Sequence, residues 1–177
     1  MIKTINSVGA IAAFMLCGFQ NASAATINEV FTESYQCNSV NLRAQSGITQ
    51  QQLRSSCDEI SETETDFYSF FNTNASSPLP NDNNTTLDVY IYLSSAEYKA
   101  NGQAHFGINI DNGGMYLEGT PSNSTNQAKF ISHICEDSWV PFSCAYTGQV
   151  YNLQHEYVHY LAGRFNVSGP FGTFTYN

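Results

Sequence analysis

Residues 150–164 read Val-Tyr-Asn-Leu-Gln-His-Glu-Tyr-Val-His-Tyr-Leu-Ala-Gly-Arg, and this stretch decides how the rest of the chain is interpreted. Four apolar residues recur in it at helical spacing and can form one buried stripe: Leu153, Tyr157, Tyr160 and Leu161. Gly163 supplies a stop signal just after the stripe. The pattern predicts an amphipathic helix over Val150–Leu161.

The same stretch contains the motif His155-Glu156-Tyr157-Val158-His159. Residues four apart on a helix share a face, so His155 and His159 can present two imidazoles to one metal ion. Glu156 is offset by one position, from which its carboxylate can act as a general base toward a water at the metal. Two imidazoles with an oxygen ligand and water favour zinc. The alternative is a pair of ordinary helix histidines, but chance spacing accounts poorly for this motif in a chain with 4 His.

The third metal ligand distinguishes the classes of zinc peptidase that share this motif. Metzincins have Gly and His at the positions that Ala162 and Phe165 occupy here, so that class is excluded. Another large class takes a Glu from a later helix. Residues 160–177 contain no Asp, Glu, His or Cys, so the sequence supplies two ligands and a base and then stops.

The composition indicates a folded, acidic, single domain. The chain has 177 residues, of which 42% are hydrophobic and 12% charged, and its formal net charge is −9. This length suits one domain with a substantial core. A negative field repels a nucleic-acid backbone and an anionic membrane surface, so neither is an expected partner.

The first 24 residues have the pattern of a secretory signal peptide. Lys3 gives a positive start, Val8–Phe19 is a 12-residue apolar run, and Ala22-Ser23-Ala24 offers a small-x-small cleavage site. The run is shorter than the roughly 20 apolar residues that span a bilayer, so a membrane anchor is the weaker alternative. We expect a leader at 1–24 and a secreted, extracellular product at 25–177.

The cysteines after the leader are even in number, as in a disulfide-bonded exported domain: Cys37, Cys57, Cys135 and Cys144. Three connectivities are possible, and proximity in sequence favours Cys37 with Cys57 and Cys135 with Cys144. A zinc site built from His133, Cys135 and Cys144 is an alternative, but it lacks four ligands at recognised spacing.

The remaining sequence predicts an α+β fold. Helices are expected over Ile48–Phe71, Ser94–Ala100 and Ser124–Ile134, and strands over Leu87–Leu93, His105–Ile110 and Gly114–Glu118. We expect these strands to form a small sheet packed on the Val150–Leu161 helix. The turn residues at 111–114 predict a hairpin between the last two strands. Gly113 and Gly114 fit either an ordinary turn or a place where a bound peptide approaches the backbone closely.

Several of these segments resemble one known family. Residues 151–165, with the pattern HEYxHYLxGR, closely resemble the active-site helix of the secreted bacterial collagenases, peptidase family M9, especially the Vibrio-type members. Residues 112–118 are similar to the family's edge strand, and residues 37–45 and 50–53 to the start of its catalytic domain. The resemblance implies a zincin-like (gluzincin) upper subdomain with a small mixed sheet and the HExxH helix.

The resemblance also implies roles for individual residues. His155 and His159 would bind catalytic zinc, and Glu156 would be the general base. Gly113 and Gly114 would lie along the substrate peptide, which adds to the sheet as an extra strand. The implied substrate is collagen, gelatin or another extracellular protein.

Glu118 matches a calcium ligand of clostridial members, with backbone carbonyls near Gly163, Val167 and Gly169 completing the shell. Carboxylate and carbonyl oxygens suit calcium. The alternative is an exposed carboxylate at a strand end.

The sequence departs from the family pattern in one respect that bears on activity. Family members supply the third zinc ligand from an EGxAEY-like segment in a lower helical subdomain, and no such segment occurs here. We therefore expect 25–177 to be a partial metallopeptidase catalytic domain from a truncated zinc endopeptidase. The alternative is a non-catalytic secreted remnant or binding module.

Overall fold

The computed structural model describes residues 25–136, 144 and 146–165, so the expected leader at 1–24 lies outside the described residues. The described strands are β1 (Glu33–Cys37), β2 (Val40–Ala44), β3 (Leu87–Tyr92), β4 (Met115–Leu117) and β5 (Ala128–His133). The described helices are α1 (Ile27–Val30), α2 (Gln50–Phe70), α3 (Ser95–Phe106) and α4 (Leu153–Gly163). This is an α+β fold, as the sequence predicts.

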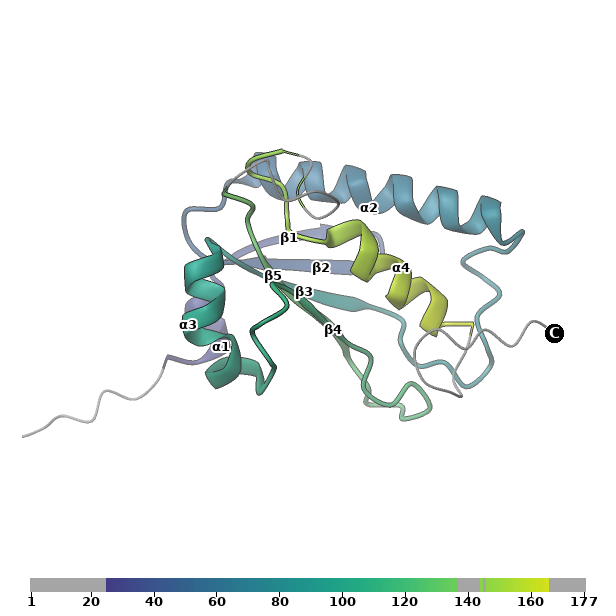
Figure 1. The fold of residues 1–177 in the computed structure, drawn as a ribbon. Coiled ribbons are helices and arrows are strands. Elements are labelled where there is room, and N and C mark those ends of the chain that lie inside the picture. The colour runs from purple at the N-terminus through teal and green to yellow at the C-terminus, as the bar shows by residue number, and fades with distance from the viewer. Residues whose placement is uncertain (1–24, 137–143, 145, 166–177) are drawn as a thin grey trace, which may run out of the picture.

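The strands form one mixed sheet in the order β1-β2-β3-β5-β4. The central pairs β2–β3 and β3–β5 are parallel, and the outer pairs β1–β2 and β4–β5 are antiparallel. β4 is therefore an edge strand, with Tyr116 opposite Phe130 of β5. Its backbone lies next to α4 (Figure 1).

Helices cover the sheet in two groups (Figure 1). The larger core cluster joins α2 and α4 to side chains such as Leu42, Val89 and Phe130. The smaller cluster contains Tyr90, Tyr92 and Ile131, which alternate with the first set along the strands and meet α1 and α3. Alternate side chains of a strand point to opposite faces, so β3 and β5 are apolar on both. None of the described helices is both long enough and apolar enough to cross a membrane.

α2 begins at a reciprocal cap. The backbone N–H of Gln52 donates to the Thr49 hydroxyl (3.2 Å), and the backbone N–H of Thr49 donates to the Gln52 side chain (3.0 Å). The structure contains the two local disulfides expected from the sequence. Cys37–Cys57 ties β1 to α2 with a Cα–Cα distance of 5.5 Å, and the second bridge joins Cys135 to Cys144.

The expected strand at His105–Ile110 is wrong, and so is the hairpin built on it. α3 is longer than predicted, since it starts at the Ser94 cap and runs through Phe106. Tyr98 and Gly102 are buried on one side of α3 and hold it against the sheet. Gly107, with a φ of 68°, ends the helix.

The expected helix at Ser124–Ile134 is also wrong, because this segment contains strand β5. β5 lies between β3 and β4 and is buried over most of its length. A strand that is covered on both faces loses the alternation of polar and apolar residues, so its sequence resembles that of a buried helix. The strands β1 and β2 were not expected at all.

Candidate metal centre

The start of α4 is fixed by the end of β5. The backbone N–H of Tyr151 donates to the carbonyl of His133 (2.9 Å), and the hydroxyl of Ser132 donates to the carbonyl of Tyr151 (2.7 Å). Ile134 and Val150 form an isolated antiparallel bridge. The stripe predicted for this helix is buried, at 2% exposure or less for each member: Leu153, Tyr157, Tyr160 and Leu161. These contacts set the rotation of α4 and therefore the direction in which the HEYVH side chains project.

The two motif histidines converge on one point. Their Nε2 atoms lie 3.0 Å apart, and their rings are nearly perpendicular with centroids 4.6 Å apart. Two nitrogens that bind one tetrahedral zinc at about 2.0–2.1 Å are separated by about 3.3 Å. The observed separation fits a shared metal ion after a small adjustment of either ring.

The protonation state of His159 suits a metal ligand. Burial, and then the neighbouring His155, lower the pKa of His159 to about 4. His159 is therefore neutral near pH 7, the form in which an imidazole nitrogen binds a metal.

The side chain of Glu156 projects from α4 toward the edge strand β4. Its side chain is buried, and a hydrogen bond from the backbone of Tyr116 in β4 reaches its carboxylate. Burial raises the pKa of Glu156, while His155 and the Tyr116 hydrogen bond act in the opposite direction. A carboxylate with a raised pKa is a better proton acceptor. Sequence reasoning missed the role of Tyr116, because nothing local marks a contact across 40 residues.

A complete set of metal ligands does not occur within the described part of the chain. No group of three or more His, Cys, Asp or Glu side chains is placed there so as to hold one ion. His155 and His159 thus form a pair without a third protein ligand among those residues. The alternative zinc site at His133, Cys135 and Cys144 has no free thiols, because its cysteines form a disulfide.

The two glycines expected to line a bound peptide lie at the start of β4. Gly113 has a φ of 72°, and a Cβ there would come within 2.9 Å of the Tyr151 ring. A Cβ at Gly114 would lie 3.3 Å from Phe130. Both positions therefore keep the backbone close to neighbouring side chains of the fold, next to an edge strand with one neighbour, β5, in the described sheet.

Glu118 lies at the opposite end of β4, where its carboxylate occupies the space that a Cβ at Gly163, the last residue of α4, would need. Burial and then the nearby Asp82 raise the pKa of Glu118. Asp82 itself accepts a hydrogen bond from Arg164 at 3.0 Å. Sequence reasoning missed Asp82 and Arg164, which are 82 residues apart. Two of the carbonyls expected beside Glu118, those of Val167 and Gly169, lie outside the described residues.

Comparison with known proteins agrees with the sequence resemblance. The family described as Collagenase, peptidase M9, matches residues 3–176. The chain is 34% identical over 161 residues to a microbial collagenase of Vibrio alginolyticus and 32% identical over 142 residues to one of Vibrio parahaemolyticus. These alignments cover 89% and 80% of this chain but 18% and 16% of the relatives. The chain therefore spans less than a fifth of the length of the curated relatives it matches.

Proposed function

Because this chain belongs to the collagenase family, peptidase family M9, we propose that residues 25–177 form part of the catalytic domain of a zinc-dependent endopeptidase. The observation that carries the proposal is the pair of Nε2 atoms of His155 and His159, 3.0 Å apart on α4, with Glu156 buried beside them. The zincin-like arrangement is part of the same proposal. It is supported by the position of α4 next to the edge strand β4.

Each residue has a distinct task in this proposal. Zinc, when bound, supplies a Lewis acid that polarises a peptide carbonyl and acidifies a water molecule. His155 and His159 hold the ion through their Nε2 atoms. The Glu156 carboxylate accepts the proton of the attacking water and transfers it to the nitrogen of the leaving amine. Burial of Glu156 raises its pKa and so strengthens it as a proton acceptor.

The substrate in this proposal is an extended polypeptide that adds to the sheet beside β4. Edge strands bind peptides through backbone hydrogen bonds. Such bonds do not depend on the side chains of the peptide, so peptides of many sequences can bind. Gly113 and Gly114 begin this edge. The names of the Vibrio relatives lead us to propose collagen, gelatin or another extracellular protein as the substrate, and the signal-like leader leads us to propose secretion.

We place calcium, as a second metal, at Glu118. The carboxylates of Glu118 and Asp82 lie close enough to affect each other, and burial raises the pKa of Glu118. Arg164 forms an ion pair with Asp82, so the negative charge of Asp82 is compensated more fully than that of Glu118. A bound cation would stabilise the ionised form of Glu118.

A non-catalytic binding module is the second candidate function. It is favoured by one observation, namely that no three-ligand metal group occurs within the part of the chain that the structure describes. Two-ligand sites bind zinc more weakly and hold it in a less defined geometry.

Zinc calorimetry combined with a gelatin or furylacryloyl-peptide assay separates the two candidates. We expect zinc binding in the wild type, its loss in His159→Ala, and its retention in Glu156→Gln with any hydrolysis abolished. Gln154→Ala, an exposed change on the same helix, is the matched control for both assays. Zinc binding without hydrolysis in the wild type would favour the binding module. No zinc binding at all would contradict the proposed metal centre.

A further inference from the structure

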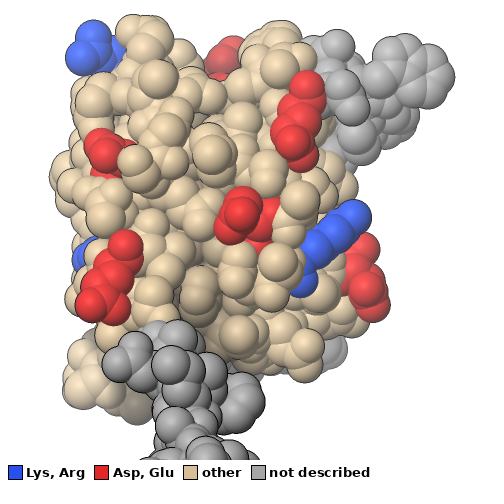
Figure 2. Space-filling model, turned by 90° about the vertical axis from the view of Figure 1, so that its left-hand side faces the viewer, with Lys and Arg blue, Asp and Glu red and all other residues tan. Residues whose placement is uncertain are grey.

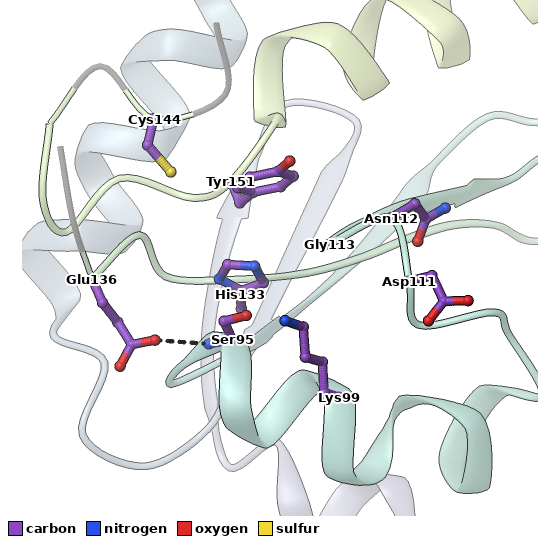
Figure 3. Close-up of a pocket in the computed structure, with 9 residues that line it drawn as sticks. All are labelled: Ser95, Lys99, Asp111, Asn112, Gly113, His133, Glu136, Cys144 and Tyr151. Atoms are coloured by element: carbon purple, nitrogen blue, oxygen red, sulfur yellow. Dashed lines mark hydrogen bonds between the residues drawn. The ribbon is translucent and has the colours of Figure 1, made fainter. Parts of the chain in front are cut away.

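A second feature of the molecule lies beside the proposed peptide-binding edge. A cavity of about 480 Å³ opens at the start of β4, and no residue of the HEYVH motif lines it. Its walls come from four places in the chain: Lys99 of α3, Asp111 and Gly113 before β4, His133 and Glu136 at the end of β5, and Tyr151 before α4. Figure 3 shows His133 in the middle, with Glu136 and Asp111 on opposite sides of it.

His133 presents a hydrogen-bond acceptor to this cavity. The residue is only 6% exposed, and its ring stacks on Tyr151 with centroids 5.0 Å apart. Nδ1 lies 2.9 Å from the carbonyl of Ile134 and, because a carbonyl can only accept, carries the proton. Burial lowers the pKa of His133, so the ring is neutral near pH 7. Nε2 then holds a lone pair and has no hydrogen-bond partner among the described residues.

The charges around the cavity have a negative balance. Asp111 and Glu136 contribute carboxylates and Lys99 contributes one ammonium group. One Glu136 oxygen accepts the backbone N–H of Ser95 at 3.2 Å, drawn as a dashed line in Figure 3. The Lys99 side chain reaches from α3 toward His133 in Figure 3, and it adds to the effect of burial in lowering the pKa of His133. Because Lys99 is exposed, a bound cation can displace its ammonium group toward solvent. The face drawn in Figure 2, which is the left-hand side of the molecule in Figure 1, carries acidic side chains spread over its surface and fewer basic ones.

We propose that this cavity receives a positively charged side chain, above all arginine, of the polypeptide bound along β4. The proposal rests on the proposed function, because it needs a peptide at that edge. The guanidinium group carries five N–H donors, which can pair with one carboxylate of the cavity, Asp111 or Glu136, and with the lone pair of His133. An acidic side chain would instead meet two like charges and an acceptor nitrogen.

The position of the cavity relative to β4 explains why a side chain would enter it. Gly113 belongs both to the cavity wall and to the segment that leads into β4 at Met115. Side chains of an added strand alternate, so every second one projects to the same side of the sheet. The residue opposite Gly113 would therefore project into the cavity, while the backbone stays on the edge. The cavity adds selectivity to an edge that by itself reads only backbone.

The test is a comparison of two peptides that differ only in arginine or citrulline, its neutral isostere. Binding is measured by calorimetry with the Glu156→Gln protein, so that hydrolysis does not interfere. We expect the arginine peptide to bind about fivefold more tightly, a modest factor because the carboxylates are exposed and screened. Asp111→Asn should reduce the ratio of arginine-peptide affinity to citrulline-peptide affinity to about one or two. Lys99→Gln should increase this ratio about twofold. Asp58→Asn, an exposed change on α2, is the control.

A second measurement separates failure of this proposal from failure of the proposed function. Agmatine, a free guanidinium compound, should shift the ¹⁵N resonance of His133 Nε2 whether or not peptides bind at β4, and Asp111→Asn should weaken the effect. The proposal is wrong if agmatine leaves the His133 resonance unchanged. It is also wrong if a matched glutamate peptide binds more tightly than the arginine and citrulline peptides and Lys99→Gln weakens the binding of that glutamate peptide. Peptides that bind with an arginine-to-citrulline ratio of one would also overturn it, while leaving edge binding intact.

Discussion

Two glycines with similar backbone angles differ in what surrounds them. Gly113 and Gly107 have φ values of 72° and 68°, a region that disfavours residues with a Cβ. A Cβ at Gly113 would press on the Tyr151 ring, which is itself stacked on His133. A Cβ at Gly107 would meet nothing within 4 Å. The pair therefore separates backbone strain from steric contact.

We expect Gly113→Ala to lower the free energy of unfolding by about 1–2 kcal/mol more than Gly107→Ala does, because only the first adds a clash to the strain. Urea denaturation of both variants measures the difference. Equal losses would mean that the Tyr151 ring moves aside without cost.

His133 should link stability to pH. Burial lowers its pKa below the usual 6.5, so the unfolded chain binds a proton that the folded chain excludes. Stability therefore falls as the pH is lowered through 6.5 toward the pKa of the folded state. The His133→Gln variant lacks this pH effect. The difference between its free energy of unfolding and that of the wild type should therefore shrink by at most about 1.4 kcal/mol per pH unit as the pH falls from 7 to 5. Chemical denaturation at several pH values measures it, and a constant deficit would contradict the assignment.

Residues of the candidate site could be predicted from the sequence only where their spacing is local. His155, Glu156 and His159 lie within one and a half turns of a helix, so their relative positions follow from helical geometry alone. Tyr116 and Asp82 reach the same region through the sheet and a loop, and no spacing in the sequence indicates their contacts. His133 was considered only as a metal ligand, because its neutral state depends on burial that the sequence does not reveal.

Secondary-structure elements were predictable where one face is apolar and the other polar. α2 and α4 fit this description and were found close to their expected bounds. β5 is covered on both sides, so its pattern was interpreted as a helix. α3 has almost no segregation of polar and apolar residues, so its end was interpreted as a strand. β1 and β2 are short and half covered. They pair with each other, and β2 joins the rest of the sheet only by pairing with β3, which is distant in sequence.

The bridge between β1 and α2 gives a prediction at the level of elements. Cys37 and Cys57 are 20 residues apart, and a loop of this size contributes about 3 kcal/mol through the lower entropy of the unfolded chain. Replacing both by serine should lower the free energy of unfolding by about that amount. Denaturation of this variant, with the Cys135→Ser/Cys144→Ser variant for comparison, measures the effect. A loss below about 1 kcal/mol would mean that the bridge contributes little to holding α2 on the sheet.

Zinc should stabilise the molecule as a whole, because the two histidines are brought together only in the folded state. For a ligand that binds the folded state alone, a concentration of 100 times its Kd adds about 2.7 kcal/mol to the free energy of unfolding. Thermal denaturation with and without zinc should show this increase, and a chelator should reverse it. The increase should vanish in His159→Ala and persist in Gln154→Ala. An equal increase in His159→Ala would place the binding elsewhere.

The position of β4 at the edge of the sheet has a consequence for self-association. An edge strand offers its backbone to any extended chain, including another copy of the same protein, and long flat edges nucleate aggregates. β4 has only three residues, Met115–Leu117, with Gly113 before it and Glu118 directly after it. So short a strand, bounded by a charge, gives a second copy too few hydrogen bonds to grow a fibril. In the proposed binding mode a peptide is also anchored in the neighbouring cavity, so the shortness of β4 would allow ligand binding while disfavouring aggregation.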